Sequence, residues 1–307
     1  MNRRTVIMGA TAMLGLAALP KTRVRAASSV KWGVANRPPV SPHGWPTWHN
    51  WRGFELSDQT MADMQDPGFI PTVWRWPQDI GAVASLDPWQ AQKPTFERPY
   101  QLLNEPDLCG EGPAYWANRY SEAYRIIKAS ALGPTSVGGI SLYWGARGDK
   151  SWLVQFLDAL DEGVQIEWLG AHAYLGWEQL RAYLDWARSL GHKAMAPGYS
   201  VKLTEVGHLY ATTLPPVLGY MEGLWTFAGK HAARLSITDV HWFVSWDPDV
   251  PEPAWLVSRL KYTGWNTLSP ATVLYTASGS LSPTGEAYRA GRKPVYSLYF
   301  PQWFGGG

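Results

Sequence analysis

Two glutamates end apolar runs of the chain, and each has a short polar residue beside it. Glu105 ends "LLNE" just before Pro106, and Glu205 ends "VKLTE" 100 positions later. If both runs are strands of one sheet, their ends can bring the two carboxyl groups face to face. One group can then hold a proton as an acid while the other stays ionised and attacks as a nucleophile. A lone strand-end glutamate is more often a salt-bridge partner or a helix cap, so only the pair indicates catalysis.

Eight strand-like runs, most of them separated by helical patterns, must position this pair. Near-continuous apolar runs are typical of parallel strands buried on both faces. The runs cover residues 30–35, 51–56, 69–75, 99–104, 135–141, 167–174, 200–205 and 239–244. The clearest helical patterns cover residues 114–130, 151–162, 177–191 and 215–231. This order predicts an α/β fold, a (β/α)8 TIM barrel. Its early helices should be short or missing, because residues 36–50 are proline-rich and residues 76–98 read mostly as loop.

A barrel of this type would place both glutamates in its active site, which forms at the C-terminal ends of the strands. Glu105 follows the fourth run and Glu205 ends the seventh, nearly across the barrel. Retaining cleavage of a glycosidic bond needs two carboxyl groups ~5–5.5 Å apart, whereas inverting cleavage needs them ~6.5–9.5 Å apart. We expect the shorter separation, with one carboxylate attacking the anomeric carbon and the other carboxyl group protonating the leaving oxygen. The second group would then act as a base and activate the water that releases the sugar.

The composition of the chain favours a sugar ligand and argues against several other classes. The 307 residues include 19 Trp, and an indole face packs well on the apolar face of a sugar ring. The net charge is only +2 with no basic block, which gives no reason to expect nucleic acid or an anionic membrane as partner. The single Cys109 excludes an internal disulfide and argues against a dithiol or cysteine-rich zinc site. The seven His are scattered and no H-E-x-x-H motif occurs, so we expect no metal and no cofactor.

Several tryptophans lie at or beyond the ends of the predicted strands. Such positions suit platforms on which sugar rings stack, although at least two of these residues should be ordinary packing. The candidates are Trp74, Trp76, Trp144, Trp177, Trp242 and Trp246.

The N-terminus reads as a processing segment. Arg3 and Arg4 precede a short apolar run, and Val24-Arg25-Ala26 has small residues where signal peptidase requires them. Residues 1–26 are therefore predicted to be a cleaved secretory signal of the twin-arginine type, and residues 27–307 one catalytic domain. The run is too short and too interrupted to span a bilayer well. We expect an exported, periplasmic or extracellular monomer without stable membrane association after processing.

The two glutamate motifs resemble those of a known group of enzymes. "LLNEPD" and "LTEVG" resemble the acid/base and nucleophile motifs of clan A glycoside hydrolases, which are retaining (β/α)8 enzymes. Within the clan, the mature chain is most similar to glycoside hydrolase family 128 and related alkali-sensitive-linkage-type cell-wall glucanases. The residues that carry this resemblance are 46–51, 69–74, 104–107, 171–174, 203–207 and 281–288.

The resemblance implies roles for five residues. Glu105 matches the general acid/base, Glu205 the nucleophile, and Asn104 the residue that hydrogen-bonds the sugar 2-hydroxyl. His172 and Tyr174 match positions that orient the nucleophile and line the sugar pocket. Asn104 as a local cap and His172 as a buried core residue remain alternatives.

The most direct expectation is an endo-β-1,3-glucanase. Two alternatives stay open: a clan A hydrolase of mannan, xylan or arabinogalactan, and a barrel that binds carbohydrate without cleaving it. The linkage, and endo or exo action, are left open by the sequence.

Overall fold

The apolar runs of the sequence form strands that are all parallel to their neighbours. The computed structural model describes residues 30–35, 45, 48–50, 66, 68–74, 98–108, 110–129, 135–141, 150–174, 176–208, 211, 213–243, 274 and 280–290. The strands are β1 (Lys31–Ala35), β2 (Trp48–Asn50), β3 (Phe69–Trp74), β4 (Arg98–Asn104), β5 (Thr135–Ser141), β6 (Ile166–Ala173), β7 (Met195–Val206) and β8 (Ile237–Trp242).

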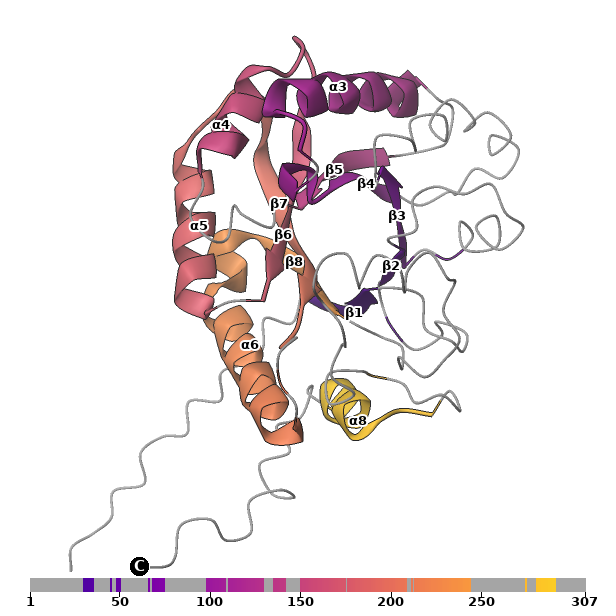
Figure 1. Cartoon of the computed structure of the whole chain (residues 1–307), viewed down its shortest axis with the longest axis vertical. Helices are drawn as coiled ribbons and strands as arrows, with labels where there is room; N and C mark the ends of the chain where they lie inside the picture. The colour runs from indigo at the N-terminus through magenta and orange to yellow at the C-terminus, as the bar shows by residue number, and fades with distance from the viewer. Residues whose placement is uncertain are drawn as a thin grey trace, which may run out of the picture.

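These strands pair in chain order from β1 to β8, and β1 also pairs with β8, so that the sheet closes (Figure 1). The predicted parallel α/β sheet is confirmed. The second strand of the ring, β2, lies at Trp48–Asn50, directly before the predicted run, and residues 51–56 themselves lie outside the described residues. Its three residues include the polar His49 and Asn50, so no apolar run marks it in the sequence.

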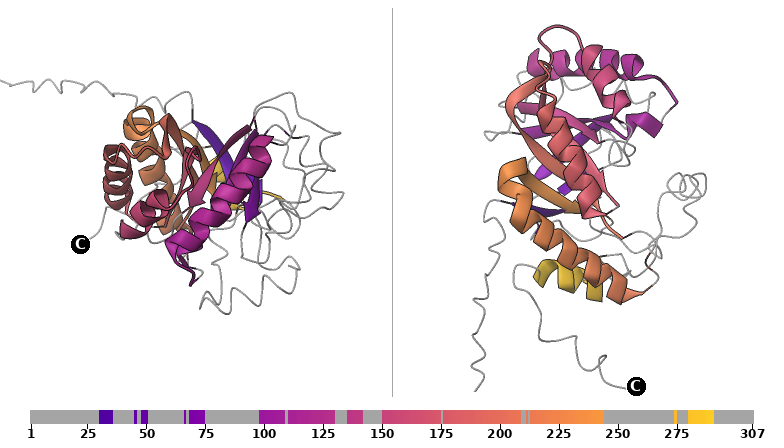
Figure 2. Two further views of the ribbon diagram at one scale, coloured as in Figure 1. Left: turned by 90° about the horizontal axis from the view of Figure 1, so that it is seen from above. Right: turned by 90° about the vertical axis from the view of Figure 1, so that its left-hand side faces the viewer.

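Helices surround the described part of the barrel on the outside. They are α3 (Pro113–Ala129), α4 (Ser151–Asp158), α5 (Trp177–Ser189), α6 (Leu214–Leu235) and α8 (Pro283–Ala290), with a short 3-10 helix η3 (Pro106–Leu108) after β4. Figures 1 and 2 show α3 to α6 around the β4–β8 side of the ring, and α8 lies next to α6 and near β1. Most of each connection among the first four strands lies outside the described residues, so the prediction about the early helices stays a prediction.

Helix α6 shows why a segment of this sequence folds as it does. Prolines in its first turn supply a preformed helical φ where no backbone N–H partner is needed. Val217, Met221 and Leu224 recur every three or four residues and are buried against the barrel. The helix ends at Leu235. The next residue, Ser236, has a left-handed φ of 51° and turns the chain into β8.

The interior of the barrel combines a large aromatic ring with polar groups. Trp168 on β6 is fully buried, and its indole lies over Gly138 of β5, where a Cβ would come within 2.7 Å of the ring. Lys202 on β7 lies 5.5 Å above the same ring and forms an ion pair with the buried Asp239 of β8. The interior is therefore filled with side chains beneath the end of the barrel that carries the glutamates.

Two further predictions concern membrane association and the N-terminal segment. Among the described residues, no helix combines the length and the apolar character that a membrane span requires. The predicted signal segment, residues 1–26, lies outside the described residues.

Candidate active site

Glu105 lies just beyond the last residue of β4, where the chain turns sharply. Its φ of 50° is in the left-handed region, which non-glycine residues rarely adopt. The turn continues into η3, with the Leu108 N–H donating to the Glu105 carbonyl at 3.1 Å. The Glu105 side chain keeps 22% of its surface exposed. It is therefore accessible at the mouth of the barrel.

Glu205 reaches the same place through an irregularity in β7. Gly170, Ala171 and His172 of β6 follow one another, but their partners on β7 are Lys202, Leu203 and then Glu205. Thr204 is the extra residue, as in a β-bulge. Lys202 faces the interior, so strict alternation from it would turn Thr204 inward and Glu205 outward. The bulge reverses this and aims Glu205 into the barrel.

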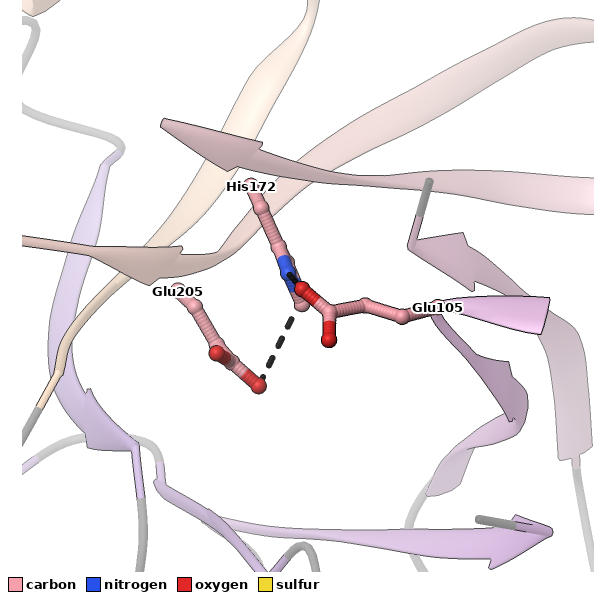
Figure 3. Close-up of side chains that lie close together, drawn as sticks. All are labelled: Glu105, His172 and Glu205. Atoms are coloured by element: carbon pink, nitrogen blue, oxygen red, sulfur yellow. Dashed lines mark hydrogen bonds and ion pairs between the residues drawn. The ribbon is translucent and has the colours of Figure 1, made fainter. Parts of the chain in front are cut away.

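His172 lies between the two glutamates (Figure 3). Its Nδ1 is 2.7 Å from Glu105 Oε1, and its Nε2 is 3.5 Å from Glu205 Oε1, which is longer than a good hydrogen bond. Burial lowers the pKa of the imidazole, although the nearby Glu205 and Asp107 act in the opposite direction. The ring is therefore neutral near pH 7 and has one N–H to give.

Tyr174 fixes the second oxygen of Glu205. Its hydroxyl donates to Glu205 Oε2. Burial, followed by the charges of Glu205 and Glu105, raises the Tyr174 pKa well above its ordinary value. The phenol thus remains a donor throughout the neutral range. The tyrosine ring meets the edge of Phe243, just after β8, at 5.8 Å between centroids.

Asn104 is half-buried at the end of β4, and Gln101 holds it from below. Gln101 Nε2 donates to Asn104 Oδ1 at 2.9 Å. Sequence reasoning missed both Gln101 and Phe243. Only alternation along β8 could have indicated Phe243. Successive side chains of a strand face opposite sides, so Phe243 faces inward if Trp242 faces outward.

Two of the six candidate tryptophans pack against other side chains, in line with the expectation that at least two would be ordinary packing. Trp242 is wrong as a sugar platform, because it is fully buried and packs on Tyr220 and Tyr288. Trp177 also has a packing role: its ring lies 4.6 Å from Tyr220 and against Gly223 of α6. Trp74 ends β3, and the position of its side chain is not described. Trp76, Trp144 and Trp246 lie outside the described residues.

The described side chains offer two kinds of chemistry at this site. Glu105, His172 and Glu205 each offer one atom that could bind a metal ion, and these three atoms lie within 4.8 Å of one another. A neutral imidazole and two carboxylates are also ligands that a transition metal accepts. The same distances bring one oxygen of each carboxyl group close enough for acid and nucleophile to act on one bond between them.

Comparison with known proteins gives similarity in structure but not in sequence. No protein-family model matches the chain, and no curated protein matches it significantly. Among solved structures, an endo-β-1,3-glucanase of glycoside hydrolase family 128 from Lentinula edodes matches with a TM-score of 0.56 and 19% identity. That match covers 85% of this chain and 100% of the other.

Two further matches differ in activity. An oligosaccharide-binding protein of the same family from Trichoderma gamsii has a TM-score of 0.56 and 14% identity, covering 90% of this chain and 98% of its own. An exo-β-1,4-mannosidase from Opitutaceae bacterium strain TAV5 has a TM-score of 0.53 and 13% identity, covering 86% of this chain and 59% of its own. The chain is thus similar in fold to the structures of glycoside hydrolase family 128, as its motifs suggested.

Proposed function

We propose that this protein is a retaining glycoside hydrolase that cleaves a β-1,3-glucan, working on a complete (β/α)8 barrel. Glu205 attacks the anomeric carbon while Glu105 protonates the leaving oxygen, which forms a glycosyl ester on Glu205. Glu105 then accepts a proton from water as that water releases the sugar. The reaction needs no metal or cofactor.

One observation carries the proposal: oxygens of the two carboxyl groups lie within 4.8 Å of each other, with a buried histidine between them. Retaining enzymes hold the two carboxyl groups ~5–5.5 Å apart, and inverting enzymes leave room for a water molecule between them. Nearest oxygens within 4.8 Å fit the shorter, retaining separation, so the site supports double displacement.

The hydrogen bonds of His172 fit the required protonation states. A neutral imidazole with its proton on Nε2 leaves Nδ1 as an acceptor. A protonated Glu105 can then donate to Nδ1 across the 2.7 Å contact, while Nε2–H faces the Glu205 carboxylate. Tyr174 donates to the other Glu205 oxygen. Glu205 thus accepts a hydrogen bond from Tyr174 and faces the polar N–H of His172, and both groups favour its ionised form.

The substrate assignment rests on the names of the structural neighbours. The structural neighbours include enzymes named as β-1,3-glucanases, one named as a mannosidase and proteins named as oligosaccharide-binding. A polysaccharide or oligosaccharide partner is consistent with all of these. The presence of both glutamates and Asn104 argues against a role in binding alone, because binding requires neither an acid nor a nucleophile.

A panel of polysaccharides tests the proposal directly. Purified protein is incubated with laminarin, curdlan, mannan, xylan and arabinogalactan, and new reducing ends are counted. We expect release from the β-1,3-glucans, and proton NMR of the first products should show the β-anomer before mutarotation. Release from mannan or xylan alone would support the other hydrolase, and initial α-anomer would exclude retention. No release from any polymer would favour a binding protein.

A variant of the nucleophile separates catalysis from binding. Glu205→Gln should reduce turnover by at least roughly 10⁴-fold, because the ester cannot form. Binding of laminarihexaose, measured by calorimetry, should persist because the amide keeps the shape of the carboxyl group. Near-normal turnover would remove Glu205 from the mechanism.

A further inference from the structure

Gln101 is a polar residue in the barrel interior for which the proposed chemistry has given no role. It lies on β4, three positions before Asn104, and is fully buried. Its Nε2 lies 2.9 Å from Asn104 Oδ1 and 3.4 Å from the carbonyl oxygen of Leu103. Both of its N–H groups therefore point toward the end of β4 that carries the site.

These two contacts determine which way round both side-chain amides lie. A backbone carbonyl oxygen can only accept, so the end of Gln101 that meets Leu103 must be the NH2 group. The Asn104 atom facing that NH2 group must then be its oxygen. It follows that the NH2 group of Asn104, a donor, is directed away from Gln101.

The surroundings leave Gln101 little freedom to turn. Gly139 of β5 has a φ of 85°, and a Cβ there would lie 2.6 Å from Gln101 Cγ and 2.6 Å from the Trp168 ring. The glutamine stem is thus confined between the backbone of β5 and the indole. Such packing fixes an amide before any ligand arrives, which is how a preorganised site is built.

We propose that Gln101 is a positioning residue that sets Asn104 as a hydrogen-bond donor to the 2-hydroxyl oxygen of the reacting sugar. This inference rests on the proposed function and deepens it. The contact to the 2-hydroxyl strengthens in the transition state of glycosidases, so Gln101 would act on turnover through Asn104 without touching the substrate. The site would accordingly discriminate against sugars that lack a 2-hydroxyl.

Two substrates and two variants test this role. The probes are 2,4-dinitrophenyl β-laminaribioside and its analogue without the 2-hydroxyl on the reacting glucose. The unaltered protein should prefer the first by roughly 100-fold or more in kcat/KM. Gln101→Met keeps the length but cannot donate, and Gln101→Glu replaces the donor by an acceptor. Each should reduce kcat on the full substrate by about 10-fold with little change in KM, and should leave the deoxy analogue almost unaffected.

A matched control identifies a merely structural effect. Thr72 is another buried polar residue of the barrel, and it pairs with Gln101 in register across β3 and β4. Thr72→Val should leave the preference for the 2-hydroxyl unchanged. Asn104→Ala should abolish the preference, and adding Gln101→Met to it should cause no further loss. Equal losses on both substrates in the Gln101 variants would show that Gln101 only packs.

A measurement without turnover separates this inference from the proposed function. In amide-labelled protein, the side-chain NH2 hydrogens of Gln101 should exchange slowly with water, and those of Asn104 quickly. Fast exchange at Gln101 would overturn the inference even if the protein hydrolyses glucans. If exchange at Gln101 is slow but the protein cleaves neither probe, the inferred orientation of the amide would stand. The role of Gln101 in turnover and the proposed hydrolase activity would both be rejected.

Discussion

Glu105 shows how a single residue can be kept in a conformation that the backbone disfavours. Its φ of 50° costs about 1–2 kcal/mol for a residue with a Cβ. Residues in such conformations cluster at active sites, where the surrounding structure maintains them. Here the turn carries the carboxyl group from the end of β4 to within 2.7 Å of His172. The strained residue is thus the one that we propose as the acid.

Glycine and alanine at position 105 separate this backbone strain from the effects of the side chain. Both substitutions remove the carboxyl group, but only alanine keeps the Cβ. We expect Glu105→Gly to be more stable than Glu105→Ala by about 1 kcal/mol in urea unfolding. The control is position 205, which lies in a strand. There the order should reverse, with glycine less stable than alanine by roughly 0.5–1 kcal/mol. If glycine were less stable than alanine at position 105 as well, Glu105 would not be strained.

Metal removal distinguishes the two kinds of chemistry that Glu105, His172 and Glu205 could support. Glycoside hydrolysis by two carboxyl groups uses no metal, so dialysis against EDTA should leave the glucanase rate unchanged. Added Zn2+ should inhibit, because it would compete with the proton on Glu105 and with the sugar for Glu205. Activity lost on chelation and restored by one metal ion per chain, counted by mass spectrometry, would instead indicate a metalloenzyme.

At the residue scale, the sequence predicted the positions of the polar side chains better than the orientations of the tryptophans. Glu105, Glu205, His172 and Tyr174 were predicted from strand ends and motifs, and the structure brings them together. Trp242 was misassigned because a strand-end position does not say which face a side chain takes. Gln101 was missed because a glutamine inside an apolar strand has no motif of its own.

Strands β7 and β8 combine an irregular register with a polar interior. Three steps on β7, from Leu203 to Val206, match two on β8, so the bulge disturbs both neighbouring ladders. Deeper in the barrel, Lys202 and Asp239 pair while buried. Next to them, burial lowers the pKa of His241 to about 4, with Asp239 opposing the shift and Lys202 and Lys31 adding to it.

The buried His241 predicts a loss of stability in mild acid. Its pKa is lower in the folded chain than its ordinary value of 6.5, so the unfolded chain takes up the proton first as the pH falls. The stabilisation is complete above pH 6.5 and is lost as the pH falls toward 4. At about 1.4 kcal/mol per pKa unit, the loss is at most about 3 kcal/mol. Urea unfolding at pH 7 and pH 4.5 measures it.

Glutamine at position 241 is the matched variant, because it is polar but does not titrate. His241→Gln should lose distinctly less stability than the unaltered protein between the two pH values. An equal loss in both proteins would assign the acid sensitivity to other groups.

Helices and strands were predictable where an apolar pattern extended over enough residues. Strands β1, β3, β4, β5, β6 and β8 and helices α3 to α6 follow apolar runs or helical periods and lie close to the expected ranges, whereas β7 begins at Met195 rather than near residue 200. Strand β2 has only three residues, which is too short for a period to emerge, and helix α8 was not predicted although it is as long as α4. The bulge at Thr204 depends on pairing with β6, so no local pattern in β7 announces it.

The molecule as a whole shares its fold with proteins of different activity. Its structural neighbours are named as an endo-β-1,3-glucanase, an oligosaccharide-binding protein and an exo-β-1,4-mannosidase. Similar barrels therefore host both cleavage and simple binding, and fold alone decides neither. What distinguishes them must lie in the carboxyl groups at the strand ends and in the side chains that line the path of the glycan.

Chain-length dependence tests whether that path is an open groove. An endo-acting enzyme holds several sugars in a row, and each subsite gains from an indole against a sugar face at about 25 cal/mol per Å² of apolar area. The sequence places Trp76, Trp144 and Trp246 beyond strand ends, so we predict that some of them serve distant subsites. Alanine at such a position should reduce activity on laminarihexaose more than on laminaritriose, with little change in melting temperature.

Trp242→Ala is the control for this series, because its side chain is fully buried. It should lower the melting temperature strongly, in line with a loss of about 3–5 kcal/mol. Its activity ratio between the two oligosaccharides should not change. If Trp76, Trp144 and Trp246 all behaved like Trp242, they would be packing residues. A closed, exo-acting pocket would then explain the site better than a groove, because a pocket gains nothing from sugars beyond its first subsites.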